Sequence, residues 1–306
     1  KAGKKILLLE QHDRVGGCAT TFKRKDFTLE VGLHEMDGLH PRDMKSKIFR
    51  DLGILDRVNF VKVPEFYRFV NGRYDVVISH DPVEVSETLT KLFPTDEEGI
   101  KLYFEFILDI RQKIKSSDIQ SDITIGEFLD NIISDEDLKL ILLGNLGYYD
   151  DDPYNLSLIY YCMAQNSYYT GGGNFIQGGS QVLSNALADI IRENGGEILL
   201  KHKVNKILTE DSLSTGIEYS KVSSEETLVA LGSEIIANAS IPQVAESLLP
   251  EEFSDFKSEY TDLRPGASLL TVYFGFNKLP SELGHHNYST FLYDPSVSGQ
   301  KDILGN

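Results

Sequence analysis

A carboxylate, an arginine and two adjacent glycines lie close together near the start of the chain. Glu10 ends the apolar run Ile6–Leu9, and Arg14, Gly16 and Gly17 follow it. Because glycine has no Cβ atom, backbone N–H groups there can approach a pyrophosphate closely, and an arginine adds positive charge beside it. A carboxylate that ends a strand can accept hydrogen bonds from ribose hydroxyls. The spacing predicts a dinucleotide site; the alternative is a solvated strand end followed by a plain turn.

The strand that presents Glu10 should be buried on both faces. Lys5–Glu10 is apolar without alternation, which is typical of a parallel strand covered by helices. Later in the chain, apolar residues spaced by three and four predict a helix over Ser180–Asn194, with Ser180 as its N-cap. A strand over Ile198–Ile207 follows two further glycines. These elements should belong to one nucleotide-binding unit.

Between these elements the pattern changes twice. Short β-rich runs, with Asn71-Gly72 as a hairpin turn, predict a small antiparallel sheet, whose strands are Val58–Val63, Tyr67–Val70 and Tyr74–Ile78. Helical spacing then predicts an insertion over Asp81–Tyr169, with Ser86 and Asp135 as capping residues. Three more strands are expected after the later helix, namely Thr215–Tyr219, Glu226–Leu231 and Glu234–Asn238. Ser240 should begin a short helix with a proline in its first turn.

The pattern resembles the two-dinucleotide-binding-domain flavoproteins, which include phytoene desaturases, retinol saturases and flavin amine oxidases. Residues 10–17 are similar to the Glu-x-x-x-x-x-Gly-Gly motif of that family, and Val31-Gly-Leu-His34 is similar to a Val-Gly-x-His segment of its retinol saturase-like members. The resemblance implies an α/β fold. It consists of a Rossmann-like FAD-binding domain with an inserted α+β substrate domain.

The resemblance also implies domain limits and strand positions. Residues 1–63 and 170–245 would form a discontinuous FAD-binding domain. Residues 64–169 and 246–306 would form the substrate domain, including the helical insertion. The segment Arg264–Asn277 looks like a strand of that substrate domain.

The implied cofactor is FAD, with NAD(P) or a quinone as its electron partner. Glu10, Arg14, Gly16 and Gly17 would contact FAD, and the residue matched by Val204 would place a backbone amide and carbonyl against the adenine ring. If an acid or base is needed, His34 and Glu35 would lie nearest to the flavin, although a packed structural histidine is the alternative for His34. An apolar substrate tunnel would be lined by aromatic residues, namely Tyr103, Phe106, Tyr273 and Phe274; an ordinary core is the alternative for the first two.

The implied function is an FAD-dependent oxidoreductase that moves a hydride between a polyene isoprenoid and flavin N5, as a desaturase or a saturase. A carotenoid or a retinoid would be the lipophilic substrate. Two alternatives stay open. One is a flavin amine oxidase, and the other is a non-catalytic, prenyl-protein-binding module of the GDP-dissociation-inhibitor type.

Composition argues against several other classes of function and of binding site. The formal net charge is −17, which argues against a nucleic-acid partner, because such binding draws its affinity from clustered cations. Two cysteines without a CxxC pair argue against structural zinc and favour a reducing, cytoplasmic compartment. The acidic run at Asp150–Asp152 is expected to be a solvated loop, so no metal is predicted. Peripheral membrane contact and the oligomeric state are left open.

The two ends of the chain suggest a fragment. The Gly-x-Gly-x-x-Gly loop of the family precedes the strand that Lys5–Glu10 resembles, and the chain does not contain it. The family's C-terminal segment that closes over the flavin is not found either. Lys1-Ala2-Gly3 reads like the last turn and glycine cap of a helix.

Overall fold

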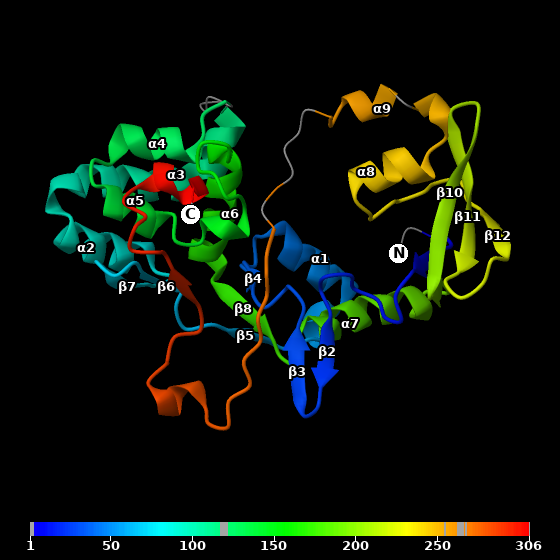
Figure 1. Ribbon diagram of the computed structural model, residues 1–306, viewed down its shortest axis with the longest axis horizontal. Coiled ribbons are helices and arrows are strands. Elements are labelled where there is room, and N and C mark those ends of the chain that lie inside the picture. Colours follow the sequence, from blue (N-terminus) through cyan, green and yellow to red (C-terminus); the bar gives the residue numbers. More distant parts are fainter. Residues whose placement is uncertain (1–2, 117–121, 254, 262–265, 267, 306) are drawn as a thin grey trace. The chain divides into compact units, whose positions relative to one another are not determined.

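The computed structural model describes residues 3–116, 122–253, 255–261, 266 and 268–305 (Figure 1). Its chain divides into two compact units. The first unit contains Lys1–Phe22, Glu30–Gly32 and Ser180–Pro265, and the second contains the remaining residues. The expected helix end at Lys1-Ala2 lies outside the described residues.

The first unit is built on one parallel strand pair. The parallel pairing is as predicted, but the residues of the first strand are half-buried and not buried on both faces. β1 (Leu7–Glu10) pairs in parallel with β9 (Glu197–Leu200), and Glu10 lies opposite Leu200. The helix α7 (Ser180–Glu193) precedes β9, and Gly195 follows its end with a φ of 79°, the left-handed conformation that glycine adopts readily. The order glycine, helix, glycine, strand is therefore confirmed.

The meander of the first unit follows β9 directly. The predicted strand over Ile198–Ile207 is interrupted at Lys201, which has a φ of 58°, so a new strand begins after it. β10 (His202–Glu210), β11 (Leu213–Lys221) and β12 (Thr227–Leu231) form an antiparallel sheet in that order. This sheet contains two of the predicted strands, and its buried face packs on a small apolar core of Ile207, Ile217 and Leu248.

The end of the first unit departs from prediction at one strand. Residues 234–238 adopt no strand conformation; the prediction of a strand there is wrong, because this segment has no ladder partner among the described residues. Glu234 instead pairs with Lys4 just before β1. The helix α8 (Ile241–Gln243) does begin at Ser240, whose hydroxyl accepts a hydrogen bond from the Gln243 amide. A π-helical turn at Val244–Leu248 and the short helix α9 (Asp255–Ser258) follow.

The second unit contains two small sheets. In one, β8 (Gly173–Ile176) lies between β4 (Met36–Asp37) and β5 (Phe60–Lys62). In the other, β6 (Tyr67–Val70) lies between β7 (Asp75–Ile78) and β13 (Thr290–Leu292). The hairpin at Asn71-Gly72 is confirmed, but the prediction that 58–63 joins it is wrong. Of those residues, Phe60–Lys62 pair with β8, a partner that no local sequence pattern indicates.

The other helices and the remaining hairpin complete the chain. The helical insertion is confirmed and contains α2 (Pro82–Leu92), α3 (Glu97–Ser116), α4 (Ile125–Ile132), α5 (Glu136–Leu142) and α6 (Leu158–Gly171) (Figure 1). α1 (Met44–Leu52) precedes them, and β2 (Thr21–Arg24) pairs with β3 (Phe27–Glu30) where the two units divide.

Capping residues explain where these helices begin. Asp135 caps α5, accepting a hydrogen bond of 3.1 Å from the Leu138 amide, as predicted. The prediction for Ser86 is wrong, because Ser86 lies inside α2. Asp81 caps that helix, and its carboxylate accepts a hydrogen bond of 2.9 Å from the Val83 amide.

The limits of the two units differ from the expected domains. Residues 33–63 and 170–179 belong to the second unit, because β8 joins β4 and β5 in one sheet. Residues 246–265 cluster with the first unit, since Leu248 packs under its meander.

The segment expected as a strand at Arg264–Asn277 is not one. Of its described residues, 268–276 have no strand conformation, so that prediction is wrong over this range; no neighbouring strand among the described residues offers its backbone a ladder. No helix in the described part of the chain is both long and apolar enough to cross a membrane.

Candidate functional site

The first candidate site follows β1 in the first unit. Glu10 ends the strand, and its Oε1 accepts a hydrogen bond of 2.8 Å from the His12 amide. Arg14 is held by the bond from its Nε to Asp13 Oδ1, at 2.9 Å, and by one from its Nη1 to the Thr21 carbonyl, at 2.8 Å. The guanidinium lowers the pKa of the Asp13 carboxyl. The charge of Arg14 is thus shared with an adjacent carboxylate, which sequence reasoning had not foreseen.

The two glycines of this loop differ in their surroundings. Gly16 has a φ of 119°, and a Cβ atom there would lie 2.5 Å from both the Ala19 carbonyl oxygen and Ser184 Oγ. Gly17 has a φ of 57°, but a Cβ atom there would meet no atom of the chain within 4 Å. Gly16 is therefore required by close packing. Gly17 borders open space, which is the arrangement that a cradle for a pyrophosphate needs.

The amino end of α7 holds this loop. Gln181 Nε2 donates to the Val15 carbonyl at 3.0 Å, and Ser184 Oγ donates to the Ala19 carbonyl at 2.7 Å. The Ser180 amide donates to Glu30 Oε2 at 2.9 Å, and the Ser180 hydroxyl also bonds that carboxylate. Ser180 is thus the first helical residue and not the N-cap that we predicted, since the carboxylate of Glu30 satisfies the helix end instead.

Val204 lies close to β1 in the same unit. It is in β10 opposite Tyr219, and a bulge follows it before Lys206. Both Val204 and Leu9 pack on the core of the meander, and the Lys201 amide donates to the His12 carbonyl at 2.8 Å. The structure therefore brings together the five residues predicted to contact FAD, namely Glu10, Arg14, Gly16, Gly17 and Val204, in one unit. Their contact with FAD stays a prediction.

We expect Glu10→Ala to weaken FAD binding. Only Oε1 of Glu10 has a hydrogen-bond partner among the described residues, so Oε2 is available to ribose hydroxyls. Loss of charge-assisted bonds should raise the FAD dissociation constant by roughly 10- to 150-fold, corresponding to about 1.5–3 kcal/mol. Titration of the full-length apoprotein with FAD measures this. Glu225→Ala, in the exposed turn before β12, is the control and should bind like wild type; equal affinity in both variants would contradict the role of Glu10.

The second candidate site lies in the second unit, around His34. Its Nε2 is 2.9 Å from the Tyr148 hydroxyl. The Tyr288 hydroxyl lies 2.6 Å from the His34 carbonyl oxygen and 3.4 Å from Nδ1. The histidine is therefore held by two tyrosines from distant parts of the chain.

Glu35, the next residue, is a buried carboxyl. It is 8% exposed, and its Oε2 has no hydrogen-bond partner in the described structure. Burial raises the pKa of Glu35 to about 7; the nearby carboxylates of Asp37 and Glu65 act in the same direction, against a hydrogen bond from Tyr168. A Cβ atom at Gly173 would lie 2.6 Å from Glu35 Oε1, so β8 closes over the carboxyl. Glu35 can therefore hold or release a proton near neutral pH.

The raised pKa of Glu35 predicts a pH-dependent stability. Unfolded Glu35 ionises near 4.5 and the folded residue near 7, so ionisation lowers stability as the pH rises through this window, and below about 4.5 the effect vanishes. Glu35→Gln should match wild type at pH 4 and exceed it at pH 8 in free energy of unfolding. Denaturation with urea at both pH values measures this. Glu87→Gln, exposed on α2, should show no such divergence; parallel curves for Glu35→Gln would refute the shift.

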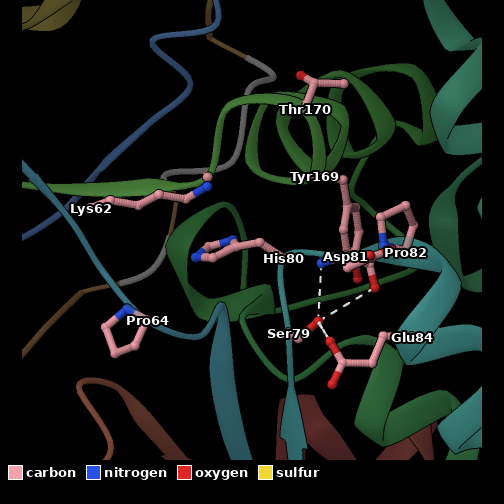
Figure 2. A pocket seen from close by; sticks show the side chains of 10 residues that line it. Lys62, Pro64, Ser79, His80, Asp81, Pro82, Glu84, Tyr169 and Thr170 are labelled. Carbon is pink, nitrogen blue, oxygen red and sulfur yellow. Dashed lines mark hydrogen bonds between the residues drawn. The ribbon is translucent and has the colours of Figure 1, made fainter.

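The second unit also contains a cavity of about 450 Å³ (Figure 2). Its walls come from the end of β5, the segment from Ser79 to Glu84, and the end of α6. Burial and then the charge of Lys62 lower the pKa of His80 to about 4, so the imidazole is neutral. Ser79 Oγ donates to Glu84 Oε2 at 2.8 Å and accepts from the Asp81 amide. The cavity walls therefore carry the ammonium group of Lys62, the neutral imidazole of His80 and the fixed carboxylate of Glu84.

The four residues predicted for a substrate tunnel do not line this cavity. Tyr103 is buried in the main core, where its hydroxyl lies 3.2 Å from that of Tyr161. Phe106 packs on Phe128 at the edge of that core. Tyr273 and Phe274 are exposed. Tyr103 and Phe106 therefore have the positions expected of ordinary core residues. A substrate tunnel lined by these four residues stays a prediction.

Several residues at both sites escaped sequence reasoning. Ser184 and Gln181 carry no local signal beyond helical spacing, although polar residues on the first turns of a helix after two glycines could have suggested a loop contact. Tyr148 adjoins the acidic run and could be noticed only as one tyrosine among many. Asp150 accepts hydrogen bonds from the amides of Asp151 and Asp152, so it shapes a turn there.

Comparison with known proteins identifies relatives over almost the whole chain. The all-trans-retinol 13,14-reductase of Danio rerio is 24% identical over 96% of this chain and 53% of its own length. The lycopene-forming phytoene desaturase of Pantoea ananas is 22% identical over 93% of this chain and 61% of its own length. The chain thus spans about half to three fifths of the length of these curated relatives.

Solved structures show the same fold. An oxidoreductase from Methanosarcina mazei superposes with a TM-score of 0.67 at 20% identity, covering 86% of this chain and 61% of that one. A Rab GDI from Plasmodium falciparum gives a TM-score of 0.50 at 12% identity, covering 76% of this chain and 59% of that one. Residues 1–300 match the model of the flavin containing amine oxidoreductases. The chain therefore belongs to the flavin containing amine oxidoreductase family.

Proposed function

We propose that the protein is an FAD-dependent oxidoreductase that moves a hydride between a polyene isoprenoid, a carotenoid or a retinoid, and flavin N5. The observation that carries this proposal is the loop after β1, in which Glu10 ends the strand and Gly17 borders open space. Membership of a flavin-containing family agrees with it, and relatives named as a retinol reductase and a phytoene desaturase favour the polyene class.

The residues of the first unit fit the nucleotide end of FAD. Glu10 Oε2 can accept from the ribose hydroxyls, and the open side of Gly17 leaves room for the pyrophosphate. Val204, half-buried in β10, offers its backbone to the adenine. When bound, the flavin would accept or donate the hydride. NAD(P) or a quinone is the proposed electron partner, and peripheral membrane contact is the proposed route to an apolar substrate.

Moving a hydride at a carbon–carbon double bond also moves a proton at the neighbouring carbon. His34 and Glu35 are the groups that we propose for it, since His34 is hydrogen-bonded on both ring nitrogens and Glu35 titrates near neutral pH. The burial of Glu35 would keep water from its carboxyl.

Anaerobic mixing of the FAD-loaded, full-length protein with substrates tests the proposal. A carotenoid or a retinoid, presented in detergent or liposomes, should change the flavin absorbance by reduction or by binding. Small primary amines should leave it unchanged. Flavin reduction by an amine, with no effect of any polyene, would overturn the proposal in favour of an amine oxidase.

A further inference from the structure

The position of the ring proton on His34 follows from its two tyrosine neighbours. Tyr288 has one hydroxyl hydrogen, and its oxygen lies 2.6 Å from the His34 carbonyl but 3.4 Å from Nδ1. The shorter distance assigns that hydrogen to the carbonyl. Tyr288 can then only accept at Nδ1, so Nδ1 of the neutral imidazole carries the proton.

This tautomer fixes the direction of the bond to Tyr148. With its proton on Nδ1, the neutral ring accepts at Nε2, so the Tyr148 hydroxyl donates to it over 2.9 Å. Burial raises the pKa of Tyr148 to about 12, against a hydrogen bond that its oxygen receives from Ser289. The phenol therefore keeps its proton at neutral pH.

The same geometry covers one ring nitrogen of His34 with Tyr148. Nε2 is the nitrogen that a base would use, and the Tyr148 hydroxyl covers it. Tyr148 is 39% exposed, whereas His34 is half-buried. The ring of Tyr148 is fixed by its edge contact with Phe291, at 5.2 Å between centroids. The more exposed of the two side chains therefore occupies the nitrogen that a base would use.

We propose that Tyr148 exchanges the proton with the substrate, and that His34 receives or returns a proton behind it. This inference rests on the proposed function and deepens it. In desaturation, a hydride leaves one substrate carbon for the flavin, and the neighbouring C–H bond breaks so that its electron pair forms the new double bond. The released proton goes to the Tyr148 oxygen while the phenol's own proton passes to His34 Nε2. Saturation is the reverse, starting from the imidazolium.

The groups around His34 and Tyr148 are compatible with both the neutral imidazole and the imidazolium form of His34. The imidazolium would keep Nδ1–H on the Tyr288 oxygen and would give Nε2–H to Tyr148. The charge of Glu35 raises the pKa of Tyr148, so an ionised Glu35 acts on this pair and can offset the positive charge of the imidazolium. A weak base suffices here, because loss of a hydride makes the neighbouring C–H bond acidic.

The tautomer is tested without any turnover. In the full-length protein carrying 15N-labelled histidine, with His34 assigned through its absence in His34→Asn, wild type should show a protonated Nδ1 and a bare Nε2. Tyr148→Phe keeps Tyr288 but removes the donor to Nε2, so Nδ1 should stay protonated and the Nε2 signal should shift as its hydrogen bond is lost. Tyr160→Phe, on the exposed side of α6, is the control and should leave the signals unchanged. A protonated Nε2 in neutral wild type would overturn the inference.

The relay is tested by hydride transfer between the flavin and a polyene, followed as reduction of the oxidised flavin or as reoxidation of the reduced flavin. Tyr148→Phe should slow it about 100-fold or more while FAD still binds, and Tyr160→Phe should react like wild type. If wild type reduces its flavin and Tyr148→Phe matches it, the relay is wrong and the proposed function stands. If no polyene either reduces the oxidised flavin or reoxidises the reduced flavin of wild type, the proposed function fails, and with it the catalytic role of Tyr148, whatever tautomer is found.

Discussion

Replacement of Gly16 by alanine is expected to abolish measurable FAD binding and to destabilise the first unit. The added Cβ atom would lie 2.5 Å from the Ala19 carbonyl and from Ser184 Oγ, far inside van der Waals contact. The backbone there is also left-handed, with a φ of 119°, which is unfavourable for alanine. The loop would have to leave α7, so we expect the free energy of unfolding to fall by about 2–4 kcal/mol. Far-UV circular dichroism in urea, together with FAD titration, measures both effects.

Gly17→Val provides the matched comparison. Its Cβ atom meets nothing within 4 Å, so only backbone strain of about 1–2 kcal/mol is expected in the apoprotein. The branched side chain would nevertheless fill the open space that we assign to the pyrophosphate. FAD affinity should therefore fall at least as far as in Glu10→Ala. Unchanged FAD affinity in Gly17→Val would show that the space serves another purpose.

The first unit could be predicted largely from the sequence because its signals are local. An apolar run without alternation predicts β1. Apolar residues at helical spacing, with glycines on both sides, predict α7 and the strand β9 after it. Val204 could be placed only through the family resemblance. What could not be predicted was the packing of Gly16 against Ser184, because it joins residues far apart in the chain.

The second unit was predictable in its helices but not in its sheets. The hairpin β6–β7 follows from Asn71-Gly72, but β5 pairs with β8 across more than a hundred residues, and no local pattern encodes such a partner. The same reason explains the environment of Glu35, whose burial depends on β8. Tyr148 and Tyr288 meet His34 only through tertiary folding, so their role could not be read from spacing.

Among the glycines of the helical insertion, Gly99 should be the one whose replacement by alanine lowers the free energy of unfolding most. It lies in the first turn of α3, and a Cβ atom there would lie 1.9 Å from the Ile132 carbonyl oxygen and 2.8 Å from Ile133 Cδ1. The carbonyl belongs to the backbone at the end of α4, so rotation of a side chain cannot relieve the clash. We therefore expect Gly99→Ala to lower the free energy of unfolding by more than about 3 kcal/mol, although alanine favours a helix.

The control for Gly99 is Gly147→Ala. No atom lies within 4 Å of a Cβ at Gly147, and its backbone is not left-handed. Alanine there should leave stability unchanged or raise it by up to about 1 kcal/mol, because it restricts the unfolded chain. The chain has no tryptophan, so urea denaturation of both variants is best followed by far-UV circular dichroism. If Gly99→Ala proved as stable as Gly147→Ala, α3 and α4 could not pack as closely as the structure has them.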